Sequence, residues 1–166
     1  WGKSFDTVSI CFSKGLGAPV GSALAGSAET IRQARRLRKV LGGGMRQAGV
    51  LAAAALYALE HNVERMAEDH AHAQILAEAF GDVDGFELES SEVETNLVWV
   101  TVDPALATAA EIVAHLKSHG VLASALGEQT VRACTHLDVN REAVERAAEI
   151  IRAIEPETLA AETVVY

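Results

Sequence analysis

A short apolar strand that ends in a lysine loop is the feature that most constrains how this chain can fold. Residues 8–12 combine β-branched and aromatic side chains without helical spacing, which predicts a short buried strand. Lys14 follows at once, and glycines at 15, 17 and 21 with Pro19 exclude a regular helix there. A lysine partly shielded from water has its charged form disfavoured, so Lys14 is a candidate amine nucleophile. From spacing alone, a solvated loop lysine is an equal alternative.

Length and composition predict a helix-rich α/β protein. The chain has 166 residues, 49% of them hydrophobic and 5% aromatic, which suits one sizeable core with a smaller subdomain. The longest apolar run, residues 50–59, is too short for a bilayer, which needs about 20 residues. No signal segment opens the sequence, so we expect a cytoplasmic protein without a membrane partner. Cys11 and Cys134 are expected to be buried free thiols.

The net charge of −9 is unevenly distributed along the chain. Residues 1–46 carry eight Lys or Arg against two acidic residues, whereas residues 47–166 carry six against twenty-one. The basic part contains the lysine loop and could attract a phosphate or a carboxylate. The acidic remainder argues against a nucleic-acid partner.

A helix with a basic face follows the lysine loop. Ser27 is a good N-cap for a helix over residues 28–41, which the glycines at 42–44 end. Its arginines are interpreted as a solvated face. Lys39 and Arg46 differ because they flank the triple glycine. A Gly-rich turn that opens the next helix would present free backbone N–H groups, so these two cations are candidates for an anion site.

Long helices are expected to connect this part to a small subdomain. The first covers residues 45–59, and Asn62 caps a second that runs to about Phe80. His70 and His72 point to nearly opposite sides of that helix, so they are read as surface histidines and not as a metal pair. We therefore divide the chain into residues 1–81, a subdomain over 82–155 and a loose tail over 156–166.

The subdomain shows a ββαββα order, which predicts a compact α+β unit with its helices on one face of an antiparallel sheet. The elements are strands at 86–88 and 96–102, a helix at 108–119, a hairpin of 121–125 with 130–134, and a last helix capped by Asp138 or Asn140. Arg132 lies in the middle of an otherwise apolar strand. It is either an ordinary solvent-facing arginine or a guanidinium that binds a carboxylate.

Two long motifs carry a family resemblance. Ser-Lys-Gly-Leu-Gly-Ala-Pro-Val-Gly-Ser at residues 13–22 and Leu-Gly-Gly-Gly-Met-Arg-Gln-Ala-Gly-Val at residues 41–50 resemble the low-specificity L-threonine aldolases, which are fold-type I pyridoxal-phosphate enzymes. The implied fold is part of that α/β fold: the end of the large-domain sheet with its helices, followed by the small C-terminal subdomain. Residues 131–138 resemble the family segment whose arginine binds the substrate α-carboxylate.

The resemblance implies a reaction and roles for four residues. Lys14 is the Schiff-base lysine of pyridoxal 5'-phosphate, and Arg132 binds the carboxylate of a β-hydroxy amino acid. Lys39 and, more strongly, Arg46 help to hold the cofactor phosphate or the substrate. The reaction is cleavage of L-threonine or L-allo-threonine between Cα and Cβ to glycine and acetaldehyde. A homo-oligomer, dimer or tetramer, is expected because active sites of this family draw groups from neighbouring subunits.

The resemblance covers only the C-terminal half of a typical member. The aspartate that faces the pyridine nitrogen, the histidine stacked on the ring and the phosphate turn lie upstream in the family. We therefore expect a fragment that is inactive alone. Two alternatives stay open: a related fold-type I lyase that performs β-elimination, and a non-catalytic remnant or interaction module built on residues 82–155.

Overall fold

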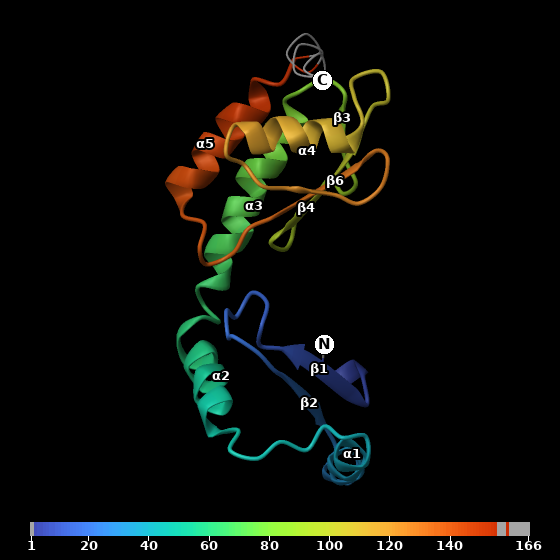
Figure 1. Ribbon diagram of the computed structural model, residues 1–166, viewed down its shortest axis with the longest axis vertical. Helices are drawn as coiled ribbons and strands as arrows, with labels where there is room; N and C mark the ends of the chain where they lie inside the picture. Colours follow the sequence, from blue (N-terminus) through green and yellow to red (C-terminus); the bar gives the residue numbers. More distant parts are fainter. Residues whose placement is uncertain (1, 156–158, 160–166) are drawn as a thin grey trace. The chain divides into compact units, whose positions relative to one another are not determined.

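The computed structural model describes residues 2–155 and residue 159, and the chain forms two compact units, Trp1–Met66 and Ala67–Tyr166 (Figure 1). The boundary lies before the one expected at residue 81. The reason is helix α3 (Met66–Gly81), whose buried side chains, including Phe80, join the hydrophobic core of the second unit.

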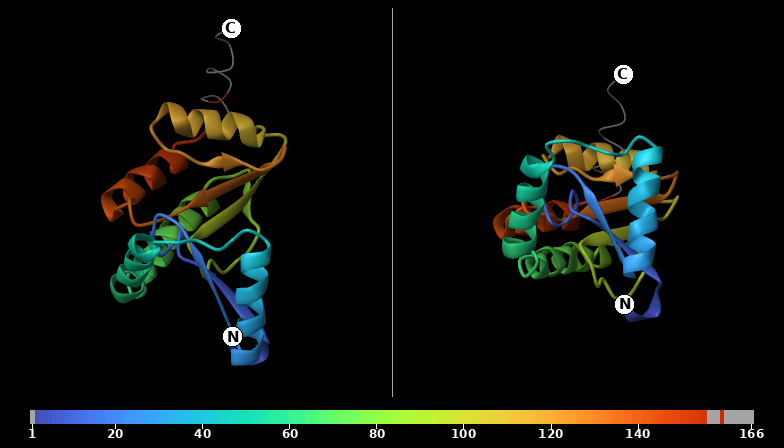
Figure 2. Two further views of the ribbon diagram at one scale, coloured as in Figure 1. Left: turned by 60° about the horizontal axis from the view of Figure 1, so that its bottom comes forward. Right: turned by 90° about the horizontal axis from the view of Figure 1, so that it is seen from below.

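The first unit is a hairpin with two helices. After a 3-10 turn at Gly2–Ser4, strands β1 (Thr7–Cys11) and β2 (Ser22–Gly26) pair antiparallel, with Cys11 opposite Ser22. Helices α1 (Ala28–Val40) and α2 (Gly49–His61) follow, and Figure 2 shows them on either side of the hairpin. The predicted Ser27 N-cap is confirmed, since the Ser27 hydroxyl accepts a hydrogen bond from the Thr30 N–H. The lysine loop is therefore the connection of a β-hairpin.

Few side chains of the first unit are buried. Leu16, Ala18 and Ala58 form its small core, and Phe12 and Met66 pack against them. The prediction of a buried strand at residues 8–12 is wrong in its burial, because β1 has the expected β-branched pattern but is almost wholly exposed. Helix α1 lies against β2, but it leaves apolar side chains of both strands exposed, among them Ile10 and Leu24 at 45% each.

The connection between α1 and α2 differs from the prediction. The glycines at 42–44 close α1, because the Gly43 N–H donates to the Arg38 carbonyl and Gly42 adopts a positive φ of 82°. Helix α2 begins only at Gly49, and Gln47 before it has a φ of 50°, which is uncommon for a residue with a side chain. The predicted start at residue 45 is therefore wrong.

The second unit confirms the predicted ββαββα order behind α3. Its strands are β3 (Phe86–Leu88), β4 (Leu97–Val102), β5 (Ser124–Ala125) and β6 (Thr130–Cys134), and its further helices are α4 (Ala109–Ser118) and α5 (Arg141–Arg152). The strands form one antiparallel sheet in the order β3-β4-β6-β5. Figure 1 shows α3, α4 and α5 gathered beside β4 and β6.

The sheet of the second unit has one buried and one open face. Along β4 and β6 every second residue is fully buried, including Val98, Val100 and Val131, and these side chains pack with helix residues such as Phe80 and Ile112. The intervening residues, among them Trp99, Thr101 and Arg132, are exposed or half-buried on the opposite face. This alternation is the period-two pattern of an antiparallel sheet with one covered face.

Helix caps and ends complete the unit. Thr108 and Glu111 form a reciprocal capping box at α4, and Asn140, rather than Asp138, caps α5 by accepting from the Ala143 N–H. Leu159 is buried in the core; the rest of the predicted tail, residues 156–158 and 160–166, lies outside the described residues. In the described part of the chain, no helix combines the length and apolarity that a membrane span requires.

His72 corrects the sequence interpretation of α3. It was expected at the surface, but the side chain is only 7% exposed, and Asp69 on the same helix is 1% exposed. His70 is half-buried. The inward face of α3 is thus more polar than its apolar spacing suggested, because α3 packs both on the sheet and beside the loop that follows β6.

Candidate active site

The lysine loop is fixed at its base by backbone hydrogen bonds. The Phe12 N–H donates to the Gly21 carbonyl, and the Ala18 N–H donates to the Phe12 carbonyl, each at 2.9 Å. Within the loop, the Gly17 N–H donates to the Lys14 carbonyl at 2.8 Å, and Gly17 has a φ of 71°. The positive φ is the conformation that glycine adopts without steric cost.

The C-terminal end of helix α2 contacts the lysine loop. The Asn62 side-chain amide, at the C-terminus of α2, donates to the Leu16 carbonyl at 2.7 Å, and Leu16 itself is 6% exposed. Asn62 was expected to cap the following helix, so its contact with the lysine loop corrects that prediction. Lys14 itself is exposed and not shielded. The loop therefore presents a free lysine side chain on a fixed backbone.

Lys39 and Arg46 flank the triple glycine in the sequence, but the turn between them differs from the one expected. The N–H groups of Gly42 and Gly43 donate to main-chain carbonyls of the last turn of α1, so they are not free for an anion. The Lys39 side chain lies against Gly44, where an added Cβ would come within 2.8 Å of Lys39 Cδ. Both cations are exposed. What the turn offers an anion is side-chain charge and not a helix N-terminus.

Arg132 lies on the open face of the sheet in the second unit. It is half-buried and stands directly opposite Trp99 on β4, with Ser124 opposite on its other side. The guanidinium carbon lies 5.8 Å from the centroid of the Trp99 ring, within the range of a cation–π contact. Within residues 2–155, Arg132 Nε is buried and no acceptor bonds to it. Arg132 thus keeps an unsatisfied N–H donor although the chain is rich in carboxylates. Such a guanidinium is suited to bind an incoming carboxylate.

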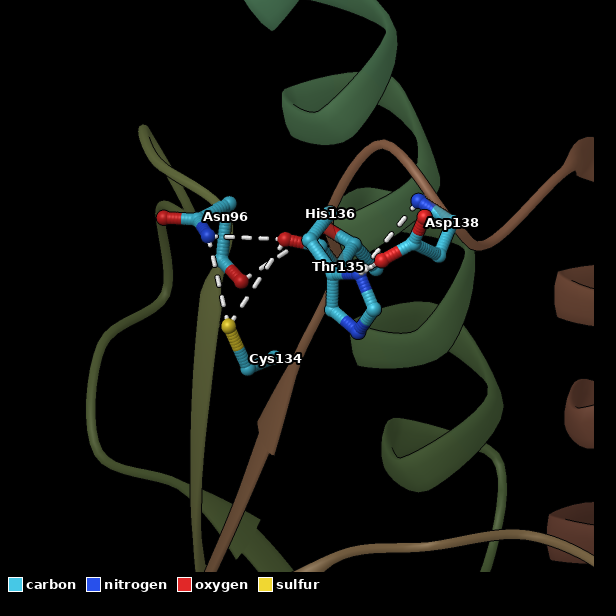
Figure 3. Close-up of polar contacts among 5 residues, drawn as sticks. All are labelled: Asn96, Cys134, Thr135, His136 and Asp138. Carbon is cyan, nitrogen blue, oxygen red and sulfur yellow. Dashed lines mark hydrogen bonds and ion pairs between the residues drawn. The ribbon is translucent and has the colours of Figure 1, made fainter. Parts of the chain in front are cut away.

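A hydrogen-bond network fixes the end of β6 beside Arg132 (Figure 3). The Asn96 amide donates to the Thr135 carbonyl at 2.7 Å and to Cys134 Sγ at 3.3 Å, and the Thr135 N–H donates to the Asn96 carbonyl at 3.0 Å. His136 contacts Asp138, with 3.5 Å between Nδ1 and the carboxylate.

The two cysteines correct the expectation of buried thiols, because both residues are free but exposed. Cys134 keeps part of its side chain inside the network, and this burial raises the pKa of the Cys134 thiol. The charge of Arg132 acts in the opposite direction, and that of Asp69 adds a smaller upward effect. The Cys134 thiol is therefore held largely protonated beside the candidate site.

The predicted site residues divide between the two units. Lys14, Lys39 and Arg46 belong to the first and Arg132 to the second. Sequence reasoning missed Trp99 and Asn62, whose roles depend on strand register and on a long-range contact that no local pattern reveals. In the described residues, no cluster of three or more His, Cys, Asp or Glu side chains could hold a metal ion.

Known proteins match the chain over most of its length. The family profile of beta-eliminating lyases matches residues 1–105. The chain is 42% identical to low-specificity L-threonine aldolase 1 of Arabidopsis thaliana over 81% of its residues and 38% of that protein. It is 43% identical to the low specificity L-threonine aldolase of Escherichia coli (strain K12) over 89% of its residues and 42% of that enzyme. The chain thus spans about two fifths of the length of these curated relatives.

Solved structures show the same fold at low identity. Serine palmitoyltransferase of Sphingomonas wittichii superposes with a TM-score of 0.73 at 18% identity, covering 96% of this chain and 41% of that one. The aminotransferase TlmJ of Streptoalloteichus hindustanus superposes with a TM-score of 0.70 at 18% identity, covering 96% of this chain and 53% of that one. A third structure, C-DES, has glycine covalently linked to its pyridoxal-phosphate cofactor. It superposes with a TM-score of 0.53 at 20% identity, covering 65% of this chain and 29% of that one. By its motifs, its fold and its match to the family profile, the chain belongs to the beta-eliminating lyase family of pyridoxal-phosphate-dependent, fold-type I enzymes.

Proposed function

We propose that the intact protein is a threonine aldolase that cleaves L-threonine or L-allo-threonine between Cα and Cβ to glycine and acetaldehyde. The names of the curated relatives support this substrate class. The observation that carries the proposal is the lysine loop, which presents Lys14 outward on a backbone fixed by β-hairpin hydrogen bonds and by Asn62. A protein that holds an aldehyde cofactor through a lysine amine needs this combination of free side chain and fixed backbone.

The residues present fit pyridoxal phosphate. The Lys14 side chain is exposed and can reach an aldehyde, and Lys39 and Arg46 add two exposed cations in the same unit for a phosphate. When bound, the cofactor supplies an electron sink for bond cleavage at Cα of an amino acid. Lys14 would hold it covalently, and Arg46 with Lys39 would offset the charge of its phosphate.

Arg132 would bind the α-carboxylate of the substrate. Its unsatisfied Nε and its fork of N–H donors suit a planar carboxylate, which accepts two parallel hydrogen bonds. Holding the carboxylate fixes which bond at Cα is presented for cleavage, and such orientation contributes strongly to rate. The same contact would discriminate against amines that lack a carboxylate.

A homo-oligomer belongs to the proposal. Helix α2 exposes large apolar side chains, including Val50 at 81%, Leu56 at 58% and Tyr57 at 61%. Apolar side chains gathered on one helix favour burial against another protein surface. Sedimentation of the intact protein at several concentrations measures this assembly.

The central test replaces Lys14 by alanine in the intact protein. We expect loss of the absorbance band of the covalently bound cofactor and loss of acetaldehyde release from threonine. Lys3→Ala is the matched control, because Lys3 is also exposed in the first unit but lies outside the loop. Persistence of both signals in Lys14→Ala would contradict the proposal.

A second candidate reaction, β-elimination, is favoured by the profile that matches residues 1–105. It would release an oxo acid and ammonia from serine or threonine, whereas the aldolase releases glycine and an aldehyde. Product analysis with threonine, allo-threonine and serine separates the two reactions.

A further inference from the structure

We propose that Trp99 is the positioning residue of Arg132: its indole ring holds the guanidinium on the open face of the sheet, ready for the substrate carboxylate. The inference rests on the proposed role of Arg132 and adds a residue that determines how well this arginine works. Its basis is the register of β4 and β6, the contact between the two side chains and the charges around them.

The register makes Trp99 the direct cross-strand neighbour of Arg132. The two residues are opposite each other in the antiparallel β4–β6 pair, both on the face that the helices leave uncovered. Directly opposite residues have Cβ atoms about 5 Å apart, so their side chains pack on each other. The 5.8 Å between the guanidinium carbon and the ring centroid is the result. The ring therefore restricts a side chain that is otherwise flexible, which lowers the entropy lost when a ligand binds.

Arg132 has an unsatisfied hydrogen-bond donor that a ligand could use. Its Nε is buried, and within residues 2–155 it has no hydrogen-bond acceptor. A buried donor without an acceptor is unfavourable, so an acceptor brought by an incoming ligand would stabilise this arrangement. The indole face stabilises the cation without occupying any of its donors, because a π system attracts the charge and leaves the N–H groups in the guanidinium plane free.

Trp99 also separates Arg132 from carboxylates of the same chain. The residue borders a pocket of about 310 Å³ that Glu89, Glu92 and Glu94 line. Strand β4 lies between β3 and β6, so Trp99 on β4 lies between Arg132 on β6 and the strand β3 from which this acidic loop begins. A smaller, non-aromatic side chain at position 99 would let the arginine turn toward these glutamates. Their carboxylates would then compete with that of the substrate.

The test compares two substitutions of Trp99 in the intact, cofactor-loaded protein. Calorimetry measures the binding of glycine, which has a carboxylate, and of glycinamide, which lacks one. We expect Trp99→Leu to weaken glycine binding by about tenfold, the size of a partly buried cation–π contact. Glycinamide binding should not change. Trp99→Phe keeps an aromatic face, so its affinity for glycine should stay close to that of the wild type. If Trp99→Leu fails to fold, Trp99→Met takes its place.

Controls separate positioning from general damage. Thr101→Ala changes the same open face two residues along β4 and should leave both affinities unchanged. In an Arg132→Gln background, Trp99→Leu should cause no further loss of glycine binding. For threonine cleavage, Trp99→Leu should lower kcat/KM, through a raised KM and through a lowered kcat, since the carboxylate contact also orients the scissile bond.

The contrary outcomes are distinct. Unchanged glycine binding in Trp99→Leu, an equal loss for glycine and glycinamide, or a full further loss in the Arg132→Gln background would each overturn the role of Trp99. If Arg132→Gln itself leaves the preference for glycine over glycinamide unchanged, the proposed carboxylate role of Arg132 fails instead.

Discussion

The Thr135 hydroxyl donates a hydrogen bond to the main-chain carbonyl of Asp69, with 2.6 Å between the two oxygens. Both residues are 1% exposed. The bond joins the end of β6 to helix α3 within the second unit, across 66 residues of sequence. Together with the Asn96 network, it fixes the C-terminal end of β6, the strand that carries Arg132.

Replacing Thr135 by valine should lower the free energy of unfolding by about 1 kcal/mol, because the shape is kept and one buried hydrogen bond is lost. Urea denaturation of the intact protein measures the change. Thr135→Ser keeps the hydroxyl and should lose less. An unchanged free energy of unfolding in Thr135→Val would contradict the contribution of the hydrogen bond, and a loss confined to Thr135→Ser would assign the effect to packing of the methyl group.

Replacing Asn62 by alanine should loosen the lysine loop, because the 2.7 Å bond to the Leu16 carbonyl disappears. Amide hydrogen exchange of residues 13–18 should accelerate by about tenfold, the equivalent of one lost hydrogen bond. Val63→Ala, at the exposed neighbouring position, is the matched control. Unchanged exchange in Asn62→Ala would show that the β-hairpin bonds fix the loop without help.

Cys134 should react with iodoacetamide only at higher pH than an ordinary cysteine, because burial raises the pKa of its thiol and the thiolate is the nucleophile. A Cys11→Ser protein isolates the signal for mass spectrometry. Arg132→Gln should move the pH profile further upward, since the arginine charge lowers the thiol pKa. An unchanged profile would mean that the guanidinium lies too far from the thiol to lower its pKa.

The capping box of α4 gives a prediction for acid. Hydrogen bonds from the Thr108 N–H and hydroxyl to the Glu111 carboxylate, each 2.7 Å long, lower the pKa of Glu111. Its contribution to stability is therefore present above the ordinary glutamate pKa of about 4.3 and is lost as the pH falls through the lowered value. Glu111→Gln should lower the free energy of unfolding at pH 7. In acid, where Glu111 is protonated, the free energies of unfolding of the variant and the wild type should converge. Thr108→Ala should cost about 1 kcal/mol in urea denaturation at pH 7.

The second unit was predictable because its signals are local. Alternating apolar residues fixed the two faces of β4 and β6, and Thr108 and Asn140 are good N-caps by type alone. Arg132 was found because a charge interrupts an apolar strand. The local pattern made Lys14 a candidate with an equal alternative, and the match to family motifs is what favours its proposed role.

The remaining features depend on contacts that the sequence does not encode locally. The Asn62–Leu16 bond joins residues far apart in the chain, and Trp99 became relevant only when the register placed it opposite Arg132. Gln47 adopts a left-handed conformation before α2, which no propensity scale predicts for glutamine. The expectation that His72 lies at the surface was wrong because the buried face of α3 is wider than its apolar stripe and includes polar residues.

The alternation along β4 and β6 has a consequence for how this unit can change. Core valines and the helix side chains that cover them occupy one face, and Trp99, Arg132 and Thr101 occupy the other. If Arg132 binds the substrate as proposed, substitutions on the open face should alter ligand preference without disturbing the packing that keeps the unit folded. A saturation library at these outward positions would let directed evolution adjust selectivity and thermal tolerance as two independent traits.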